Sequence, residues 1–366
     1  NRPFQQVYEP GSVIKPLVIA GLLESGELLP TEMIEAPMTL RVGQKTFRDV
    51  ARHDPVLSIP DVLAYSSNSA MIFLGQRFEP AQLHDWMWRF GIGQDMDLES
   101  TFTRSGLLNP WHLWVPQDQA ANSIGQNLST TPLQLAAAYS VFANDGLRME
   151  PYLVERIEDR NGRVIYQHRP DPERIVSTQT ARLVTEVLAA NVTGGTGRNA
   201  RISSGQPAAG KTGTTNDSTD VWFVGYTPQL ATAVWMGAPE GSISLARAGL
   251  GGATGGRYPA ATWGRYYSLI MEDVPTVEFR EPETTRRGRS VGRIPYESGG
   301  SGSGSGRGGR TTTPRRPSGG TTTTTTAPDD GDGDGGGGDG ETPDTTAPAT
   351  TAPATTAAPA QPDFSP

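Results

Sequence analysis

The 366-residue chain contains no cysteine, which excludes disulfide frameworks, cysteine-ligated zinc and thiol catalysis. Histidine is also scarce, and the four histidines are widely separated, at His53, His84, His112 and His168. A histidine-based zinc site needs closer spacing than this. We therefore expect no metal and no other cofactor.

Lysine is almost absent, because 28 of the 31 basic residues are arginine and only Lys15, Lys45 and Lys211 are lysine. Arginine does not lose its proton in proteins, whereas lysine does so when it is desolvated or lies beside another cation. Each lysine is therefore a candidate for chemistry. Lys45 matches no motif, and we predict that it is a surface charge.

Long hydrophobic runs and a basic stripe are missing too. No run approaches the 18 apolar residues of a membrane-spanning helix, and no signal peptide is present. The net charge of −8 is a mild acidity that argues against nucleic acid as the main partner. Because a motif follows Asn1 within a dozen residues, we interpret the chain as a fragment whose missing N-terminal segment holds any membrane anchor.

Composition divides the chain near its end. Residues 299–366 hold 16 of the 44 glycines, 9 of the 30 prolines and a single aromatic residue, Phe364. Such a segment cannot bury enough apolar surface to offset its ordering entropy. The sequence therefore predicts one large domain over residues 1–280, a linker over 281–298 and a disordered tail over 299–366.

Helices are predicted over residues 12–24, 58–76 with a turn at 66–68, 83–90, 131–145, 178–190 and 258–272. Pro16 lies just inside the first helix and is expected to cost it a backbone hydrogen bond. Strands are predicted late in the chain, over 208–214, 220–226 and 230–236. This order favours an α+β or mixed three-layer domain. Residues 273–298 are predicted to form a fraying, arginine-rich connection.

Two short motifs place a hydroxyl beside a second polar group. Ser12 and Lys15 are three residues apart, so on a helix they share one face, and a neutral lysine there can take the proton of the serine hydroxyl. Ser66 and Asn68 lie on a turn between two helices, where they can relay a proton and hold a substrate amide. Serine and asparagine are ordinary turn residues, so this second motif alone has little weight.

A third motif lies on a predicted strand. Lys211 supplies a fixed positive charge, and the hydroxyls of Thr212 and Thr214 can bind a carboxylate. Gly213 lacks a side chain and would allow a substrate backbone to approach the strand.

The order and spacing of the three motifs carry a family resemblance. Ser66 follows Ser12 by 54 positions, and Lys211 follows Asn68 by 143 positions. This set resembles the signature of penicillin-recognising serine acyltransferases, and the chain resembles the transpeptidase domain of penicillin-binding proteins. The resemblance extends over residues 1–272 and includes stretches at 8–12, 125–136, 195–200 and 220–228.

The subclass is open, because residues 1–140 resemble class B enzymes and residues 190–240 resemble class A enzymes. The resemblance implies an α+β fold, a three-layer α/β/α sandwich with an antiparallel sheet. The family fold also places strands before the nucleophile, which residues 1–11 are too few to supply.

The resemblance also implies catalytic roles. Ser12 is implied as the nucleophile and Lys15 as its base, with Lys211 lowering the proton affinity of Lys15. Ser66 would pass the proton to the leaving group, and Asn68 would orient Lys15 and the substrate amide.

Substrate-binding roles follow in the same way. Thr212 and Thr214 would hold the terminal carboxylate of the substrate, with Lys211 supplying charge. The backbone N–H groups of Ser12 and Thr214 would form the oxyanion hole. Trp222 is a candidate substrate-binding residue at the rim of the site, and a packing role in the sheet core is the alternative.

The implied function is that of a peptidoglycan D,D-transpeptidase in the bacterial cell envelope, outside the cytoplasmic membrane. Its substrates would be stem peptides ending in D-Ala-D-Ala, β-lactams would trap it covalently, and proteins of cell-wall synthesis are candidate partners. No nucleic acid partner is implied.

Two alternatives stay open. The first is a hydrolase, either a D,D-carboxypeptidase or a β-lactamase. Residues 79–83 resemble the β-lactamase loop that carries the deacylating glutamate, but Glu79 follows Asn68 by only 11 positions. The second is a non-catalytic penicillin-binding module, which has no need of Ser12, Lys15 and Lys211 together.

Overall fold

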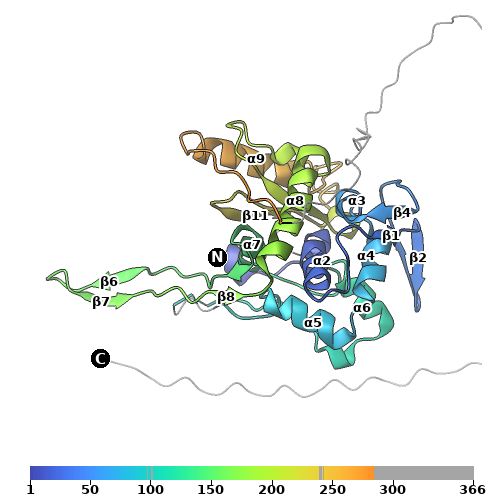
Figure 1. The fold of residues 1–366 in the computed structure, drawn as a ribbon, viewed down its shortest axis with the longest axis horizontal. Coiled ribbons are helices and arrows are strands. Elements are labelled where there is room, and N and C mark those ends of the chain that lie inside the picture. The colour runs from blue at the N-terminus through green and yellow to red at the C-terminus, as the bar shows by residue number, and fades with distance from the viewer. Residues whose placement is uncertain (97, 100–101, 239–240, 242, 284–366) are drawn as a thin grey trace, which may run out of the picture. The chain divides into compact units, whose positions relative to one another are not determined.

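The computed structural model describes the folded part of the chain, over residues 1–96, 98–99, 102–238, 241 and 243–283 (Figure 1). The predicted tail and most of the predicted linker lie outside these residues. Within the described part, no helix is both long enough and apolar enough to cross a membrane.

The central sheet of the described part has three antiparallel strands in the order β11–β10–β9. They are β9 (Ala209–Thr214), β10 (Asp220–Tyr226) and β11 (Ala231–Gly237), which agree with the predicted runs to within one residue. The predicted hairpin between β10 and β11 is closed by a hydrogen bond of 2.9 Å from the Thr227 N–H to the Leu230 carbonyl.

Strand β10 explains why the domain has three layers. Its side chains alternate between two faces, and both faces are buried. Trp222, Val224 and Tyr226 belong to the main hydrophobic core on one face. Phe223 points to the other face, where its ring meets Trp263 at a centroid distance of 5.4 Å.

Helices cover both faces of this sheet. Helices α7 (Pro132–Ala143) and α8 (Thr178–Gly194) pack on one face, and α9 (Tyr258–Ile270) packs on the other. Figure 1 shows α7 and α9 on opposite sides of β11. The predicted α+β fold with an α/β/α arrangement is confirmed.

A second group of helices surrounds α2 (Lys15–Glu24), which is buried along most of its length against α4, α5 and α8. The other members of the group are α3 (Ile59–Ala64), α4 (Asn68–Gly75), α5 (Pro80–Arg89) and α6 (Pro116–Asn122). Two small sheets flank them, β1 (Met33–Glu35) with β4 (Val56–Ser58) and β2 (Thr39–Val42) with β3 (Lys45–Arg48). Helix α1 (Arg2–Gln5) precedes them all.

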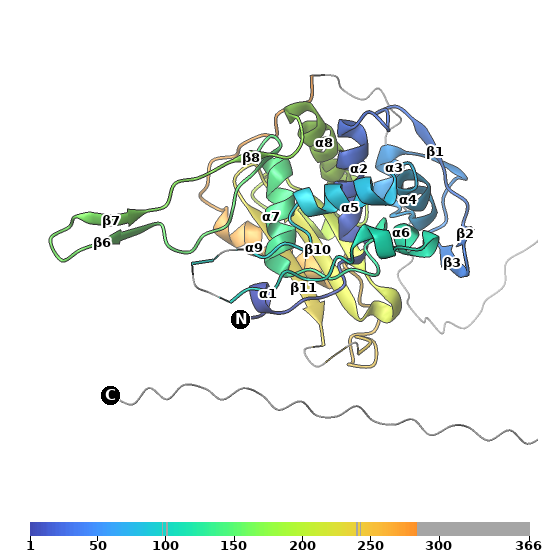
Figure 2. The ribbon, with the colours of Figure 1, turned by 90° about the horizontal axis from the view of Figure 1, so that it is seen from below.

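A hairpin that the sequence analysis did not predict extends from the domain after α7 (Figures 1 and 2). Its base pairs β5 (Leu147–Arg148) with β8 (Glu173–Arg174), and its arm pairs β6 (Arg156–Glu158) with β7 (Val164–Gln167). All side chains of the arm strands are exposed, so no buried face imposes the alternation that predicts a strand.

The expectation that Pro16 costs a hydrogen bond is wrong. A 3-10 turn, Gly11–Ile14, precedes α2, so Pro16 falls in the first turn of the α-helix, where a backbone N–H has no intrahelical acceptor. The carbonyl of Val13, three residues before Pro16, accepts a hydrogen bond of 2.7 Å from the hydroxyl of Tyr139 on α7.

Residues 273–283 also differ from the prediction, because they are tied to the domain rather than frayed. The side-chain amide of Gln206 donates to the Val274 carbonyl at 3.0 Å. Arg280 lies 2.9 Å from the carboxylate of Asp145 at the end of α7. The boundary of the domain at residue 280 stays a prediction.

The layered packing predicts the effect of removing Trp263. This side chain is fully buried, stacks on Tyr267 at 3.7 Å and lies under β10. We expect Trp263→Ala to lower the free energy of unfolding by about 3–5 kcal/mol in urea denaturation. Leu269→Ala on the same helix is the control, because that side chain is 66% exposed and its loss should cost less than about 0.5 kcal/mol. Equal losses in the two variants would contradict this packing.

Candidate active site

Ser12 lies in the 3-10 turn that leads directly into α2. Gly11 begins this turn with a φ of +56°, in the left-handed region that favours glycine. Its N–H donates to the Gly125 carbonyl at 2.9 Å, and a Cβ on Gly125 would lie 1.9 Å from the Gly11 carbonyl oxygen. Two glycines therefore fix the backbone that carries the predicted nucleophile.

Trp222 holds the chain just before Ser12 from the sheet side. Its indole N–H donates to the Glu9 carbonyl at 2.9 Å, and its ring meets Tyr8 edge-on. The side chain is 0% exposed, so it has no surface to offer a ligand. Its burial favours the packing alternative, and a contact of Trp222 with substrate stays a prediction.

Lys15 is fully buried, and its ammonium group lies in the turn between α3 and α4. It donates to the Ser66 carbonyl at 2.7 Å, the Ser67 carbonyl at 3.3 Å and Asn68 Oδ1 at 2.7 Å. Burial lowers the pKa of Lys15 well below its usual value, and the positive charge of Lys211 lowers it further.

Lys211 reaches the same turn from β9. Its ammonium group donates to Ser66 Oγ and to the Thr212 carbonyl, each at 3.0 Å. Burial lowers the pKa of Lys211 from its usual value to about 7. Ser66 Oγ therefore lies between two buried amines, 3.3 Å from Lys15 and 3.0 Å from Lys211.

The structure thus brings together Lys15 from α2, Ser66 and Asn68 from the turn that opens α4, and Lys211 from β9. Ser12 is one turn before Lys15 at the start of the same helical segment, but the hydrogen bonds of the described residues do not join the two side chains. The catalytic roles of these residues stay predictions at this point.

Ser66 carries backbone strain as well as these contacts. Its φ of +57° is a left-handed conformation that costs a serine about 1–3 kcal/mol. Lys15 binds its carbonyl and Lys211 binds its hydroxyl, so the two lysines help to hold the strained residue in place.

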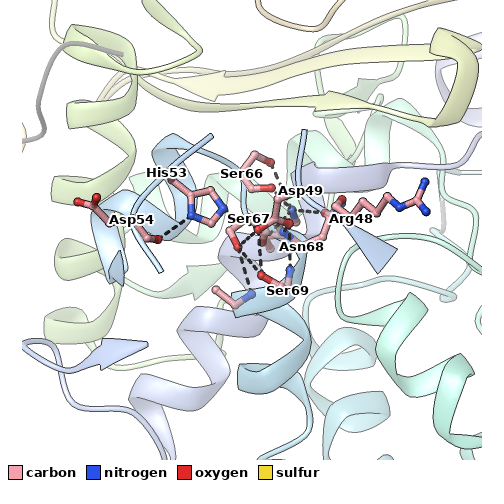
Figure 3. A network of polar contacts seen from close by, with 10 residues as sticks. Arg48, Asp49, His53, Asp54, Ser66, Ser67, Asn68 and Ser69 are labelled. Carbon is pink, nitrogen blue, oxygen red and sulfur yellow. Dashed lines mark hydrogen bonds and ion pairs between the residues drawn. The ribbon is translucent and has the colours of Figure 1, made fainter. Parts of the chain in front are cut away.

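No motif contains Asp49, yet its carboxylate accepts five hydrogen bonds beside this turn (Figure 3). The donors are His53 Nε2, the hydroxyls of Ser67 and Ser69, and the backbone N–H groups of Asn68 and Ser69. Burial pushes the pKa of Asp49 upward, but the hydrogen bonds from Ser67, His53 and Ser69 outweigh it and lower the pKa. The sequence holds no signal for this residue, because it lies in a loop outside any periodic pattern.

The two threonines predicted to bind a carboxylate differ in access. Thr212 is 7% exposed, and its hydroxyl lies 2.8 Å from that of Thr196. Thr214 is exposed, and its hydroxyl accepts a hydrogen bond of 3.1 Å from the Gly255 N–H, which leaves the hydroxyl proton available. Thr214 therefore has the better access to a ligand.

Gly213 lets β9 pack closely against the 3-10 turn that carries Ser12. A Cβ on Gly213 would lie 2.8 Å from the Pro10 carbonyl oxygen and 3.0 Å from Val13 Cγ1. The absence of a side chain is thus explained by packing within the protein, and a close approach of substrate at Gly213 stays a prediction.

Two further sequence predictions concern residues outside this cluster. Lys45 is exposed, as predicted, and donates to Gln126 Oε1 at 3.1 Å. Glu79 precedes α5, and its backbone N–H donates to the side chain of Gln82 at 2.9 Å, so this stretch caps a helix.

Comparisons with known proteins agree with this arrangement. The family described as penicillin-binding protein transpeptidase domain matches residues 1–247. PbpB of Mycolicibacterium smegmatis is 31% identical over 263 residues, covering 66% of this chain and 40% of that protein. Penicillin-binding protein 1A of Neisseria lactamica is 29% identical over 295 residues, covering 77% of this chain and 34% of that protein. The chain spans less than half the length of these curated relatives.

Solved structures show the same fold. Penicillin-binding protein 3 of Mycobacterium tuberculosis in complex with aztreonam has a TM-score of 0.65 and 29% identity, covering 78% of this chain and 67% of that chain. Its complex with ampicillin also has a TM-score of 0.65, with 28% identity, covering 81% of this chain and 68% of that chain. The family match, the fold and the three motifs lead to one conclusion: the chain belongs to the penicillin-binding protein transpeptidase domain family.

Proposed function

We propose that this domain is a peptidoglycan D,D-transpeptidase of the bacterial cell envelope, acting outside the cytoplasmic membrane. Ser12 Oγ attacks the carbonyl of the penultimate D-alanine of a stem peptide, and the bond to the terminal D-alanine breaks. An amine of a second stem peptide then attacks the acyl-enzyme and loses a proton, the new amide bond forms the cross-link, and Ser12 Oγ regains a proton as the ester bond breaks. The observation that carries this proposal is the pair of buried lysines on either side of Ser66 Oγ.

Lys15 acts as the base in this proposal. It lies one turn after Ser12, and both burial and the charge of Lys211 disfavour its protonated form. A neutral Lys15 takes the proton of Ser12 as the new ester bond forms. Ser66, 3.3 Å from Lys15, then returns the proton to the amine of the departing D-alanine.

Lys211 and Thr214 bind the terminal carboxylate of the stem peptide. Because the pKa of Lys211 is about 7, an approaching carboxylate favours its charged form. The exposed hydroxyl of Thr214 donates to the same carboxylate, with Thr212 and Gly213 shaping the strand beneath it.

The oxyanion hole consists of the backbone N–H groups of Ser12 and Thr214. Two observations support this placement. The N–H of Ser12 lies in the first turn of a 3-10 helix, where it has no intrahelical acceptor. A Cβ on Gly11 would lie 3.6 Å from the Thr214 carbonyl oxygen, so the backbones that carry the two N–H groups are close together.

β-Lactams acylate Ser12 in this proposal. Two structural neighbours carry aztreonam or ampicillin, which supports this class of inhibitor. Proteins of cell-wall synthesis are proposed partners, and any membrane attachment is proposed to involve residues outside this chain. A hydrolase differs from a transpeptidase in the lifetime of its acyl-enzyme, because it supplies an efficient water attack.

The first test is covalent labelling by a fluorescent penicillin, followed by intact mass. We expect one adduct per chain at Ser12 and no adduct in Ser12→Ala. Ser203→Ala is the control, since that serine is exposed and outside the site. Labelling of Ser12→Ala would contradict the nucleophile assignment, and loss of the wild-type label as fast as it forms would favour a hydrolase.

The second test replaces the base. Lys15→Arg keeps a positive charge but removes a group that can become neutral, so we expect the acylation rate constant to fall by about 10²–10⁴-fold. Lys45→Arg makes the same change at an exposed lysine and should acylate at the wild-type rate. Stopped-flow measurement compares the two. A wild-type rate in Lys15→Arg would show that Lys15 is not the base.

A further inference from the structure

Asp49, at the end of β3, forms hydrogen bonds to the turn that carries Ser66 and Asn68. Asp49 directly follows β3, and its Oδ1 accepts from the backbone N–H groups of Asn68 at 2.5 Å and Ser69 at 3.1 Å. These groups open helix α4, where no intrahelical acceptor exists and a negative charge is favoured. The carboxylate therefore ties the first turn of α4 to β3.

The second carboxylate oxygen of Asp49 accepts three further hydrogen bonds. Asp49 Oδ2 accepts from the hydroxyl of Ser67 at 2.6 Å, from that of Ser69 at 2.9 Å and from His53 Nε2 at 2.7 Å. The Asp49 side chain is 2% exposed. A carboxylate so buried and so fully bonded has no contact to offer a substrate, and it acts through the residues that it holds.

Asn68 is held from two sides, which fixes the direction of its amide. Its backbone N–H binds Asp49, and its Nδ2 donates to the carbonyl of the adjacent Arg48 at 2.9 Å. Figure 3 shows the guanidinium of Arg48 pointing away from the cluster, so this residue contributes its carbonyl. Asn68 Oδ1 is thereby left facing the ammonium group of Lys15 at 2.7 Å.

His53, which lies outside the turn, forms a hydrogen bond to Asp49. Its Nδ1 lies 2.8 Å from the Asp54 carbonyl oxygen and its Nε2 lies 2.7 Å from the Asp49 carboxylate (Figure 3). The carboxylate is an acceptor, so Nε2 donates to it, and the ring is held between Asp49 and the Asp54 carbonyl. The pair is buried, with side-chain exposures of 0% and 2%, so the carboxylate of Asp49 has a protein donor where water has little access.

The position of this turn also determines the position of the Lys15 ammonium group. Every hydrogen bond that the ammonium group makes in the described structure goes to residues 66–68. Ser66 is strained and would relax if the turn were released. We propose that Asp49 is a positioning residue for the acylation of Ser12, fixing residues 66–69 so that Ser66 and Asn68 hold Lys15. This inference rests on the proposed function, since acylation is the reaction that is positioned.

The test compares acylation by a fluorescent penicillin from pH 5 to pH 10 in the wild type, Asp49→Asn and Asp145→Asn. We expect Asp49→Asn to acylate about 10–100-fold more slowly, because the groups around Lys15 lose their alignment. The acid limb of its pH profile should also move to lower pH, since the charge of Asp49 raises the pKa of Lys15. Asp145, bound by Arg182 and Arg280 away from the site, is the matched control and should change neither.

Three outcomes would overturn the inference. The first is a wild-type rate in Asp49→Asn. The second is a slower rate with an unmoved acid limb, which is what a merely structural role gives. The third concerns His53→Gln, the variant to use if Asp49→Asn does not fold. Glutamine replaces the ring that lies between Asp49 and the Asp54 carbonyl, so acylation should slow, and a wild-type rate counts against the inference.

Failure of the proposed function is distinguished by the wild type. If the wild-type chain takes no label, acylation is not its activity, whatever Asp49 does. The proton affinity of Lys15 then tests the role of Asp49 alone, by lysine-selective nuclear magnetic resonance. Lys15 should titrate at lower pH in Asp49→Asn than in the wild type, and an equal titration would overturn the inference.

Discussion

Two amines buried against one hydroxyl are the constraint on which the rest of this domain depends. Lys15 and Lys211 are both 0% exposed, and both lie within 3.3 Å of Ser66 Oγ. Burying one ammonium ion is costly, and burying a second beside it adds repulsion, so the pKa of Lys15 lies well below its usual value and that of Lys211 falls to about 7. In the proposed function, the lowered pKa of Lys15 lets it take the proton of the Ser12 hydroxyl. The titration belongs to the pair rather than to either lysine.

The fold supplies the surroundings that keep these amines in place. Helix α2 is buried along most of its length, which puts Lys15 in the interior. Strand β9, which carries Lys211, packs against the turn that holds Ser12, because Gly213 leaves room for the Pro10 carbonyl. The turn between α3 and α4 completes the site from a third direction, and Asp49 ties that turn to β3. The site is therefore assembled where three separate packing units meet.

Much of this could be predicted from the sequence, and the rest fails for physical reasons. The pairing of Ser12 with Lys15 follows from helical spacing, and the three strands follow from buried runs separated by turns. Trp222 is buried because helices cover both faces of β10, and a local sequence pattern cannot predict this covering. Asp49 and His53 were beyond prediction, because their contacts span loops that only the folded chain brings together.

The most direct test of this account is a pH titration of the lysine side chains by nuclear magnetic resonance, with selectively labelled lysine. The chain has only three lysines, so the spectrum is simple, and the exposed Lys45 provides the surface reference. The account predicts that Lys15 and Lys211 both titrate well below the usual range of lysine, with Lys211 changing near pH 7. If all three lysines stayed charged up to the same pH, the buried pair would not provide a base, and the account would be contradicted.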